Sequence, residues 1–435
     1  MHLGLFLLAA GHHAAGWRYP GAESGTENFE LISRIAREAE AAKFDMVFFG
    51  DRLVTSKDAH PSMITRPDPL VVLAMLAVQT RRIGLAATAS TTYSDPFTLA
   101  RSLASVDLLS KGRAAWNIVT SVQDGSGNFS RAQHPESGER YAIAQEFVQV
   151  VQGLWRSWDA DPYVRDKERG VYIDTDKLHA LQHAGHYFQV EGPLNVTRSA
   201  QGEPVLIQAG SSGPGQQLGA RYGEVIFTAQ QDLQAAQTFY NELKQQVSAE
   251  GRDPSQVKVM PGLMPIVGQT EEEARDKLAR LQAFTDQSKA HHMLSVELDY
   301  DVSGLDLDGP VPDLPEADGG FSRRKLLLKI ARDQRLTLRQ LYHHVASSRG
   351  HQVVAGTAEQ IADHMQHWVE AGAADGFNIM PAYFPSGFEE FTRQVVPILQ
   401  ARGLFRKDYE GHTLREHLGL SQPQAGLRSS SIESP

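Results

Sequence analysis

Short apolar segments recur along this chain, and most of them are followed by a segment whose apolar residues have helical spacing. The segments expected to form buried strands are residues 3–9, 44–49, 82–89, 114–119, 205–207, 224–228, 257–267 and 376–381. Alternating strands and helices indicate parallel strands joined by crossover helices, and eight of them predict a (β/α)8 TIM barrel. An open doubly wound sheet is the alternative, but no G-x-G-x-x-G follows the first strand.

Two long stretches interrupt this alternation, at about residues 123–200 and 270–356. Both are rich in charged and turn-forming residues, so we expect insertions after strands four and seven. The barrel and its insertions are expected to form a single domain over residues 1–421. The Ser-rich tail, residues 422–435, is expected to be disordered.

Composition excludes several kinds of partner and compartment. A formal net charge of −10 argues against nucleic acid and anionic membranes as partners. The absence of cysteine removes disulfides, thiolate catalysis and sulfur-ligated metals, which suits a cytoplasmic enzyme. The apolar start MHLGLFLLAAG has no Lys or Arg before it, and no later run approaches the ~18 apolar residues of a membrane span. We therefore expect a first buried strand there, and no membrane segment.

Polar residues follow several of the expected strands. In a barrel of this kind the carboxyl ends of the strands surround the active site. The residues collected at this mouth are His12, Asp51, Thr88, Ser90, Asn117, Thr120, Ser121, Ser211 and Ser212. For any one of them, capping a helix or turn remains the alternative.

The stretch PVLIQAGSSG, residues 204–213, combines a strand, a turn of small residues and the start of a helix. Backbone N–H groups and two hydroxyls at such a turn can hold an anion such as phosphate. No Lys follows the glycines, so this is not a nucleoside-triphosphate loop. A polar strand-to-helix turn without a ligand is the alternative.

Other chemistries fit the same residues less well. The adjacent His12 and His13 cannot both face one metal from a strand, so no metal site is expected. Asp51 is the single clear carboxylate at a strand end, whereas a glycosidase needs two. Gly210-Ser211-Ser212-Gly213 is too short for a G-x-S-x-G nucleophile elbow. A lining of hydroxyls and amides suits a phosphorylated cofactor that supplies the reactivity itself.

Several motifs resemble one enzyme family over nearly the whole chain. The longest is IGLAATASTTYSDPFTLARSLASVDLLSKGRAAWNIVTS, residues 83–121. The others are GHHAAGWRYP, ERYAIAQEF, VRDKERGVY, GPLNV, PVLIQAGSS, VVAGTAEQIADH, GAADGFNIMPAYFPSG and RGLFRKDYEGHTLREHLGL. Together they resemble the bacterial luciferase-like flavin monooxygenases. The subfamily they resemble contains nitrilotriacetate monooxygenase, dibenzothiophene-sulfone monooxygenase and pristinamycin IIA synthase.

The resemblance implies a barrel that holds reduced FMN (FMNH2), delivered by a separate NAD(P)H-dependent flavin reductase. Reaction with O2 would give a flavin C4a-(hydro)peroxide that inserts one oxygen atom into a small organic substrate. The flavin contacts it implies are Asp51, Thr88, Asn117, Tyr141, Ser211 and Ser212. Relatives commonly carry His four residues before the tyrosine, as in HDERY, whereas this chain has Ser137 in SGERY. Two alternatives follow: His134 compensates from the loop, or Ser137 makes a smaller contact.

The substrate and the catalytic residues stay unassigned at this level. His12, Trp17 and Tyr93 are candidates for the substrate wall, with ordinary packing as the alternative for the two aromatic residues. Residues 70–78 form a helix that is apolar on most sides, which together with the resemblance predicts a homodimer or homotetramer. Two other functions stay open: a deazaflavin-dependent dehydrogenase on the same barrel, and a flavin-binding protein without turnover.

Overall fold

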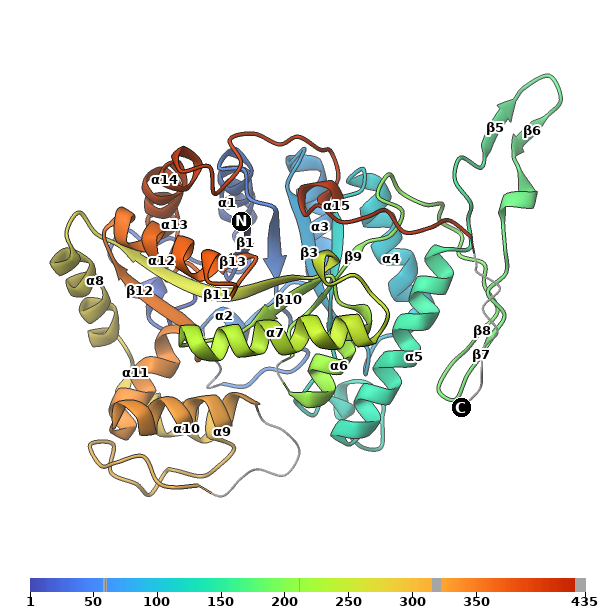
Figure 1. Ribbon diagram of the computed structural model, residues 1–435. Coiled ribbons are helices and arrows are strands. Elements are labelled where there is room, and N and C mark those ends of the chain that lie inside the picture. The colour runs from blue at the N-terminus through green and yellow to red at the C-terminus, as the bar shows by residue number, and fades with distance from the viewer. Residues whose placement is uncertain (58, 60, 211, 315–321, 427–435) are drawn as a thin grey trace.

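The computed structural model describes residues 1–57, 59, 61–210, 212–314 and 322–426. Its centre is a closed ring of parallel strands (Figure 1). In the order around the ring these are β10 (Val225–Thr228), β9 (Val205–Gln208), β4 (Ala114–Val119), β3 (Gly84–Ser90), β2 (Met46–Phe49), β1 (His2–Phe6), β13 (Gly376–Ile379) and β11 (Lys258–Val267). The pairing of β10 with β11 closes the ring. This confirms the (β/α)8 barrel and all eight expected strands.

Helices surround the barrel, and neighbours in the ring pack against each other. They are α1 (Phe29–Ala41), α3 (Pro69–Gln79), α4 (Pro96–Leu109), α5 (Ser137–Trp155), α6 (Gly213–Tyr222), α7 (Leu233–Ala249), α12 (Ala358–Glu370), α13 (Ser386–Glu390) and α14 (Val396–Ala401), with a π-helical turn (Phe391–Val395) between the last two. Their starts follow ordinary capping chemistry. The Asp95 carboxylate, for example, accepts a hydrogen bond from the Thr98 backbone N–H (2.8 Å) just before Pro96 opens α4.

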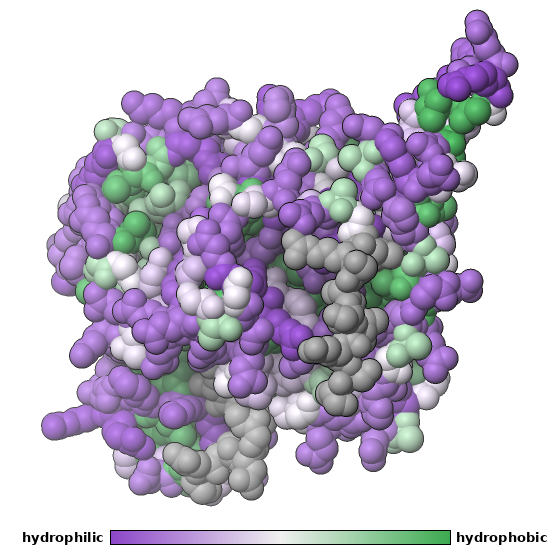
Figure 2. Space-filling view, turned by 45° about the vertical axis from the view of Figure 1, so that its right-hand side comes forward, coloured by the Kyte–Doolittle hydropathy of each residue, from purple (hydrophilic) through white to green (hydrophobic). Residues whose placement is uncertain are grey.

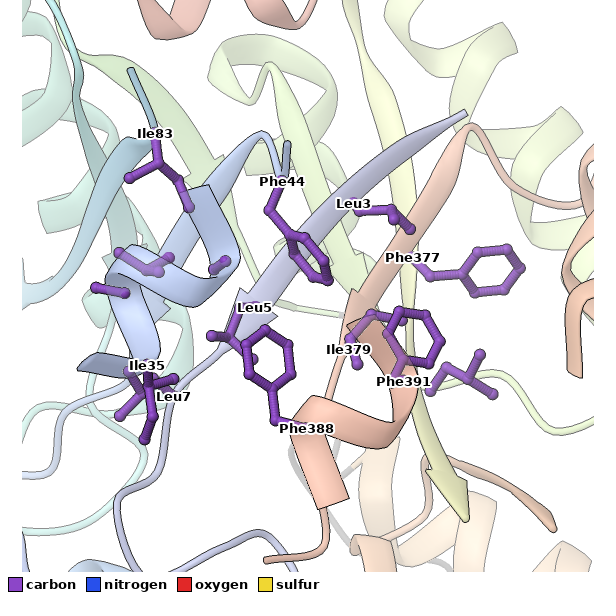
Figure 3. Close-up of a cluster of buried hydrophobic side chains, with 14 of the residues drawn as sticks. Leu3, Leu5, Leu7, Ile35, Phe44, Ile83, Phe377, Ile379, Phe388 and Phe391 are labelled. Atoms are coloured by element: carbon purple, nitrogen blue, oxygen red, sulfur yellow. The ribbon is translucent and has the colours of Figure 1, made fainter. Parts of the chain in front are cut away.

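The strands alternate between two buried faces, because successive side chains point to opposite sides of a strand. On β1, Leu3 and Leu5 face outward and pack with residues of β13 and the helices behind it (Figure 3). Phe388 and Phe391 contribute rings to the same layer. The inward positions Met46, Ala86, Ala115, Val205 and Val225 fill the barrel itself.

The amino-terminal end of the barrel is closed by the last part of the chain. Helix α15 (Leu414–His417) places Leu414 in the interior cluster, close to Gly84. Arg415, which is buried, donates to the Glu224 carboxylate at 2.5 and 3.1 Å. Helix α15 therefore leaves the opposite, carboxyl-terminal end of the barrel uncovered.

The chain between β4 and β9 leaves the barrel and returns. It first forms α5, which packs between α4 and α6 in the outer ring. Beyond it lie two small antiparallel pairs, β5 (Tyr163–Asp166) with β6 (Val171–Ile173) and β7 (His183–Ala184) with β8 (Gln189–Val190). The β5–β6 hairpin stands clear of the body of the protein (Figure 1 and Figure 2).

The chain between β11 and β13 builds a small helical layer beside the barrel mouth. Its elements are α8 (Glu271–Ala283), α9 (Ala290–Leu298), α10 (Ser322–Gln334), α11 (Leu338–Ser348) and β12 (Gln352–Gly356). Helices α9, α10 and α11 share a core of their own. Strand β12 was not expected from the sequence, and it pairs in parallel with the last five residues of β11.

Two short helices complete the architecture: α2 (Pro61–Ile64), in the loop after β2, and α15. Within the described part of the chain, no helix is both long and apolar enough to cross a bilayer. Of the tail expected to be disordered, residues 427–435 lie outside the described residues. Residues 422–426 are described and lie outside helices and strands.

Candidate active site

One side of the barrel mouth is polar. Thr88 and Asn117 lie in the carboxyl-terminal halves of neighbouring strands, β3 and β4, and both are buried at inward positions. The Asn117 side-chain amide donates to the Thr88 hydroxyl at 2.8 Å. The Asn117 Oδ1 atom is buried and accepts no hydrogen bond from the described residues. Because a buried polar atom without a partner is costly, this pair has hydrogen-bonding capacity left for a ligand.

The second polar feature joins the starts of two helices. Ser212 caps α6, where its hydroxyl accepts from the Gly215 backbone N–H at 3.3 Å. Tyr141, in the second turn of α5, reaches across so that its hydroxyl lies 3.2 Å from the Ser212 hydroxyl. Ser211, the other serine expected at this turn, lies outside the described residues. Two helix amino termini thus meet at a pair of hydroxyls, which is an arrangement that binds anions.

Gly215 permits this close approach. A Cβ at this position would lie 3.1 Å from each of three atoms: Tyr141 Oη, Ser212 Oγ and Gly210 Cα. A larger residue would therefore require these neighbouring atoms to move by a few tenths of an ångström. Sequence reasoning singled out the serines of the turn and missed this glycine, although the spacing Gly213-Pro214-Gly215 was its visible signal.

Ser137 and Arg140 lie at the amino end of α5, just before Tyr141. Ser137 is the first residue of the helix and is partly exposed. Arg140 donates to the Pro135 carbonyl at 2.7 Å, while its Nε is buried without a partner among the described residues. Burial lowers the pKa of Arg140, and Tyr141 and Tyr93 lie within its electrostatic range. Arg140 was not among the expected site residues, although it belongs to the ERYAIAQEF motif.

Tyr93 and His134 contact each other and hold a loop in place. The Tyr93 hydroxyl accepts from the Gly125 backbone N–H (2.8 Å) and shares a hydrogen bond with His134 Nδ1 (2.6 Å). The Tyr93 ring also stacks on Phe129, with centroids 4.7 Å apart. Burial and the nearby Arg140 charge lower the pKa of His134. These contacts tie residues 125–134 to the end of β3, and a role in the substrate wall stays a prediction.

His12 lies on the other side of the mouth. Its Nε2–H donates to the Phe6 carbonyl at 2.8 Å, which leaves Nδ1 with the free lone pair. Burial lowers the pKa of His12 to about 3, so the ring is neutral at physiological pH. Asp51 follows the end of β2, the strand that pairs with β1, and its carboxylate accepts from the Arg52 backbone N–H at 2.7 Å. Burial raises the pKa of Asp51.

Aromatic rings form the floor on this side. The Phe6 ring meets those of His12, Phe48 and Phe227 edge-on, with centroid distances of 4.6, 4.8 and 5.6 Å. His351, which precedes β12, stacks on Phe227 at 4.9 Å. Sequence reasoning missed these rings, because a Phe at the end of a buried strand looks like ordinary core. The mouth is thus polar over β3, β4 and β9 and aromatic over β1, β2 and β10.

Trp17 differs from the other expected wall residues. It lies in a short turn (Gly16–Arg18), and its side chain is 48% exposed. Among the described residues, no group of three or more His, Asp or Glu side chains is placed to hold a metal ion. The chemistry that the described mouth offers is anion binding at the α5 and α6 termini, and hydrogen bonding at Thr88 and Asn117.

Comparison with known proteins agrees with this geometry. The family model for luciferase-like monooxygenases matches residues 1–375. The chain is 50% identical to N-acetyl-S-(2-succino)cysteine monooxygenase of Bacillus subtilis (strain 168), over 97% of each chain. It is 44% identical to nitrilotriacetate monooxygenase component A of Aminobacter aminovorans, over 98% of this chain and 97% of that one. The solved EDTA monooxygenase from Chelativorans sp. BNC1 superposes with a TM-score of 0.81 at 32% identity, covering 97% of this chain and 98% of that chain.

Proposed function

We propose that this chain uses reduced FMN and O2 to insert one oxygen atom into a small organic substrate. The premise is that the chain belongs to the luciferase-like monooxygenase family and is a flavin-dependent monooxygenase. The family assignment disfavours the alternatives of a deazaflavin-dependent dehydrogenase and a flavin binder without turnover. When bound, reduced flavin supplies the activation of O2 that no side chain of the barrel can provide.

The meeting of α5 and α6 is the observation that carries this proposal. Tyr141 and Ser212, 3.2 Å apart, would hold the FMN phosphate with the backbone N–H groups of the α6 start, and Ser211 would join them. Gly215 keeps that space open. A phosphate dianion needs several donors, and two helix termini with hydroxyls supply them.

The remaining polar residues of the mouth would orient the flavin ring. Its edge carries both hydrogen-bond donors and acceptors, which match the free Asn117 Oδ1 and the Thr88 hydroxyl proton. Asp51 and Ser137 stay proposed contacts at the edges of this site. The helical layer of α9, α10 and α11 would exclude water from the mouth during the reaction. No side chain is assigned as the acid or base.

The partner would be a separate NAD(P)H-dependent flavin reductase. The relative from Aminobacter aminovorans is named as component A, which fits a two-component system. We propose that the two proteins meet in the cytoplasm, where NAD(P)H is available to reduce the flavin.

For the substrate we propose a thioether or amine that carries several carboxylate groups. The named substrates of the three relatives above, N-acetyl-S-(2-succino)cysteine, nitrilotriacetate and EDTA, share this chemistry. The aromatic floor over Phe6 and Phe227 would take the less polar part of such a molecule.

Oxygen labelling tests the proposal directly. The protein, FMN, NADH, a generic flavin reductase and a panel of carboxylated thioethers and amines are incubated under 18O2. Transfer of one labelled oxygen atom to a panel member or its cleavage product is expected. Reoxidation of the bound reduced flavin with release of all the oxygen as peroxide, for every panel member, would contradict the proposal.

A further inference from the structure

Arg66 is a partly buried cation whose hydrogen-bond partners are backbone carbonyls. It lies in the loop between α2 and α3, where its Nη1 donates to the Gly50 carbonyl and its Nε donates to the Ser62 carbonyl at 3.1 Å. Its Nη2 is buried and has no hydrogen-bond partner among the described residues. One N–H-bearing nitrogen of a charged group is thus left without an acceptor.

The guanidinium lies at the aromatic side of the mouth. A Cβ on Gly50 would lie 3.3 Å from Arg66 Nη1 and 3.0 Å from the Phe6 ring, so these two side chains flank the same backbone position. The charge of Arg66 also disfavours protonation of His12. Arg66 is therefore next to the His12–Phe6 pair, away from the helix termini that would hold phosphate.

A second cation acts on the same imidazole. Arg349 ends α11 in the helical layer, and its charge also disfavours protonation of His12. The two arginines come from different parts of the chain, Arg66 from the β2 side of the barrel and Arg349 from the insertion after β11. Both positive charges act on the surroundings of His12, and an anion bound beside this ring would be stabilised by them.

Electrostatics makes a bound anion the natural partner of Arg66. A partly buried charge is stabilised when an opposite charge pairs with it, and a buried donor atom of a charged group is costly to leave without an acceptor. Within the described residues, no carboxylate lies within 4 Å of Arg66. Asp51, which acts on it from farther away, already accepts the Arg52 N–H. Burial lowers the pKa of Arg66 only to about 10, so it stays charged at neutral pH.

We propose that Arg66 binds a carboxylate of the substrate through its free Nη2, and so selects carboxylated thioethers or amines over their neutral analogues. This inference rests on the proposed function, since it assigns one end of the substrate in that site. The arginine fork suits the planar carboxylate, and the less polar part of the molecule would extend over Phe6.

The test compares two ligands of similar shape, one anionic and one neutral. Thiodiglycolate carries a carboxylate on each side of a sulfur atom, and its diamide has a similar shape, no charge and an N–H donor in place of one acceptor oxygen at each end. Calorimetry with the full chain, in the presence of saturating FMN, gives the ratio of their dissociation constants. We expect the wild type to prefer thiodiglycolate by at least ~10-fold, the loss that one charge-assisted hydrogen bond predicts.

Two substitutions and a control decide the role of Arg66. Arg66→Met is expected to abolish the preference while leaving affinity for the diamide close to that of the wild type, and Arg66→Lys is expected to keep part of it. Arg37→Met is the matched control, because Arg37 is an exposed arginine of α1 that bonds Gln79 at 3.0 Å. It should leave the ratio unchanged.

Three results would overturn the inference: no preference in the wild type, the same preference in Arg66→Met, or an equal loss of both ligands in that variant. The equal loss would assign Arg66 to holding the loop alone. The binding ratio is measured without turnover, so it is independent of oxygen transfer. A protein that fails the labelling experiment but shows the Arg66-dependent preference refutes the proposed reaction and supports the carboxylate site.

Discussion

Replacing Ser212 by alanine tests the assignment of the phosphate site most directly. In the structure this hydroxyl has two contacts, the Gly215 backbone N–H at 3.3 Å and the Tyr141 hydroxyl at 3.2 Å. The substitution removes a helix cap and, if the assignment is correct, one donor to the phosphate. These two losses affect different measurements.

The magnitudes follow from the two roles. Loss of a serine cap costs about 1 kcal/mol of folding stability. Loss of a hydrogen bond to a charged group costs about 1.5 to 3 kcal/mol, which corresponds to a loss of affinity of roughly 10- to 100-fold. Backbone N–H groups at the start of α6 would remain, so binding of FMN should weaken without vanishing.

The assay is anaerobic fluorescence titration with reduced FMN and, in parallel, with reduced riboflavin, which lacks the phosphate. Affinity for FMN should fall and affinity for riboflavin should stay nearly constant. Thr270→Ala is the matched control, because Thr270 caps α8 by accepting from the Glu273 N–H at 3.1 Å. It should lower stability similarly and leave both affinities unchanged. If Ser212→Ala weakens both flavins equally, the phosphate does not lie at this turn.

Three further predictions concern the same structure. Gly215→Ala should weaken FMN binding because the added methyl would lie 3.1 Å from the Tyr141 and Ser212 oxygens. Gly213→Ala is the control, because a Cβ there would meet no atom within 4 Å. Equal FMN titration curves for the two variants would contradict the reasoning. Burial lowers the pKa values of His12 and His13 to about 3, so the unfolded chain takes up protons first as pH falls below 6.5, and stability should drop by about 1.4 kcal/mol per histidine at pH 5.5. Urea unfolding at pH 5.5 and 7.5 should show a smaller drop for His12→Gln, and an unchanged drop would contradict this. Val71 and Val78 on α3 and Leu109 on α4 are 67, 69 and 68% exposed, so we expect the protein to form a homodimer through this apolar face. Val78→Glu is expected to convert the dimer to monomers. Wild-type protein that is monomeric at micromolar concentration by light scattering would contradict the prediction.

The barrel was predictable because its signal is local. Each strand is a short apolar run buried on both faces, and a capped helix follows it. The residues of each element are therefore enough to identify that element. Strand β12 escaped because Gln352–Gly356 is only partly buried and follows a stretch without clear periodicity. Its partner is the carboxyl-terminal half of β11, and no local sequence pattern indicates this pairing.

The candidate site was predictable only in part, for a related reason. The serine turn and Tyr141 stood out through their motifs, yet their meeting joins residues 71 positions apart. Gly215 matters for the volume it leaves empty, and that volume exists only once α5 and α6 are in place. Arg66 precedes a proline in a polar loop, where an arginine is usually solvated. Its partly buried position depends on the Gly50 and Ser62 carbonyls that the fold brings to it.

The shared strand β11 has an evolutionary consequence. Its first residues close the barrel against β10 and β13, while its last five pair with β12, so the insertion leaves and re-enters at neighbouring backbone positions. Val267, where the chain departs, is in register with Gly356, where it returns. A segment whose two ends lie side by side can be lengthened, shortened or exchanged without straining its anchor. Selection can therefore change the layer that carries Arg349 while the polar side of the barrel mouth, over β3, β4 and β9, keeps its geometry.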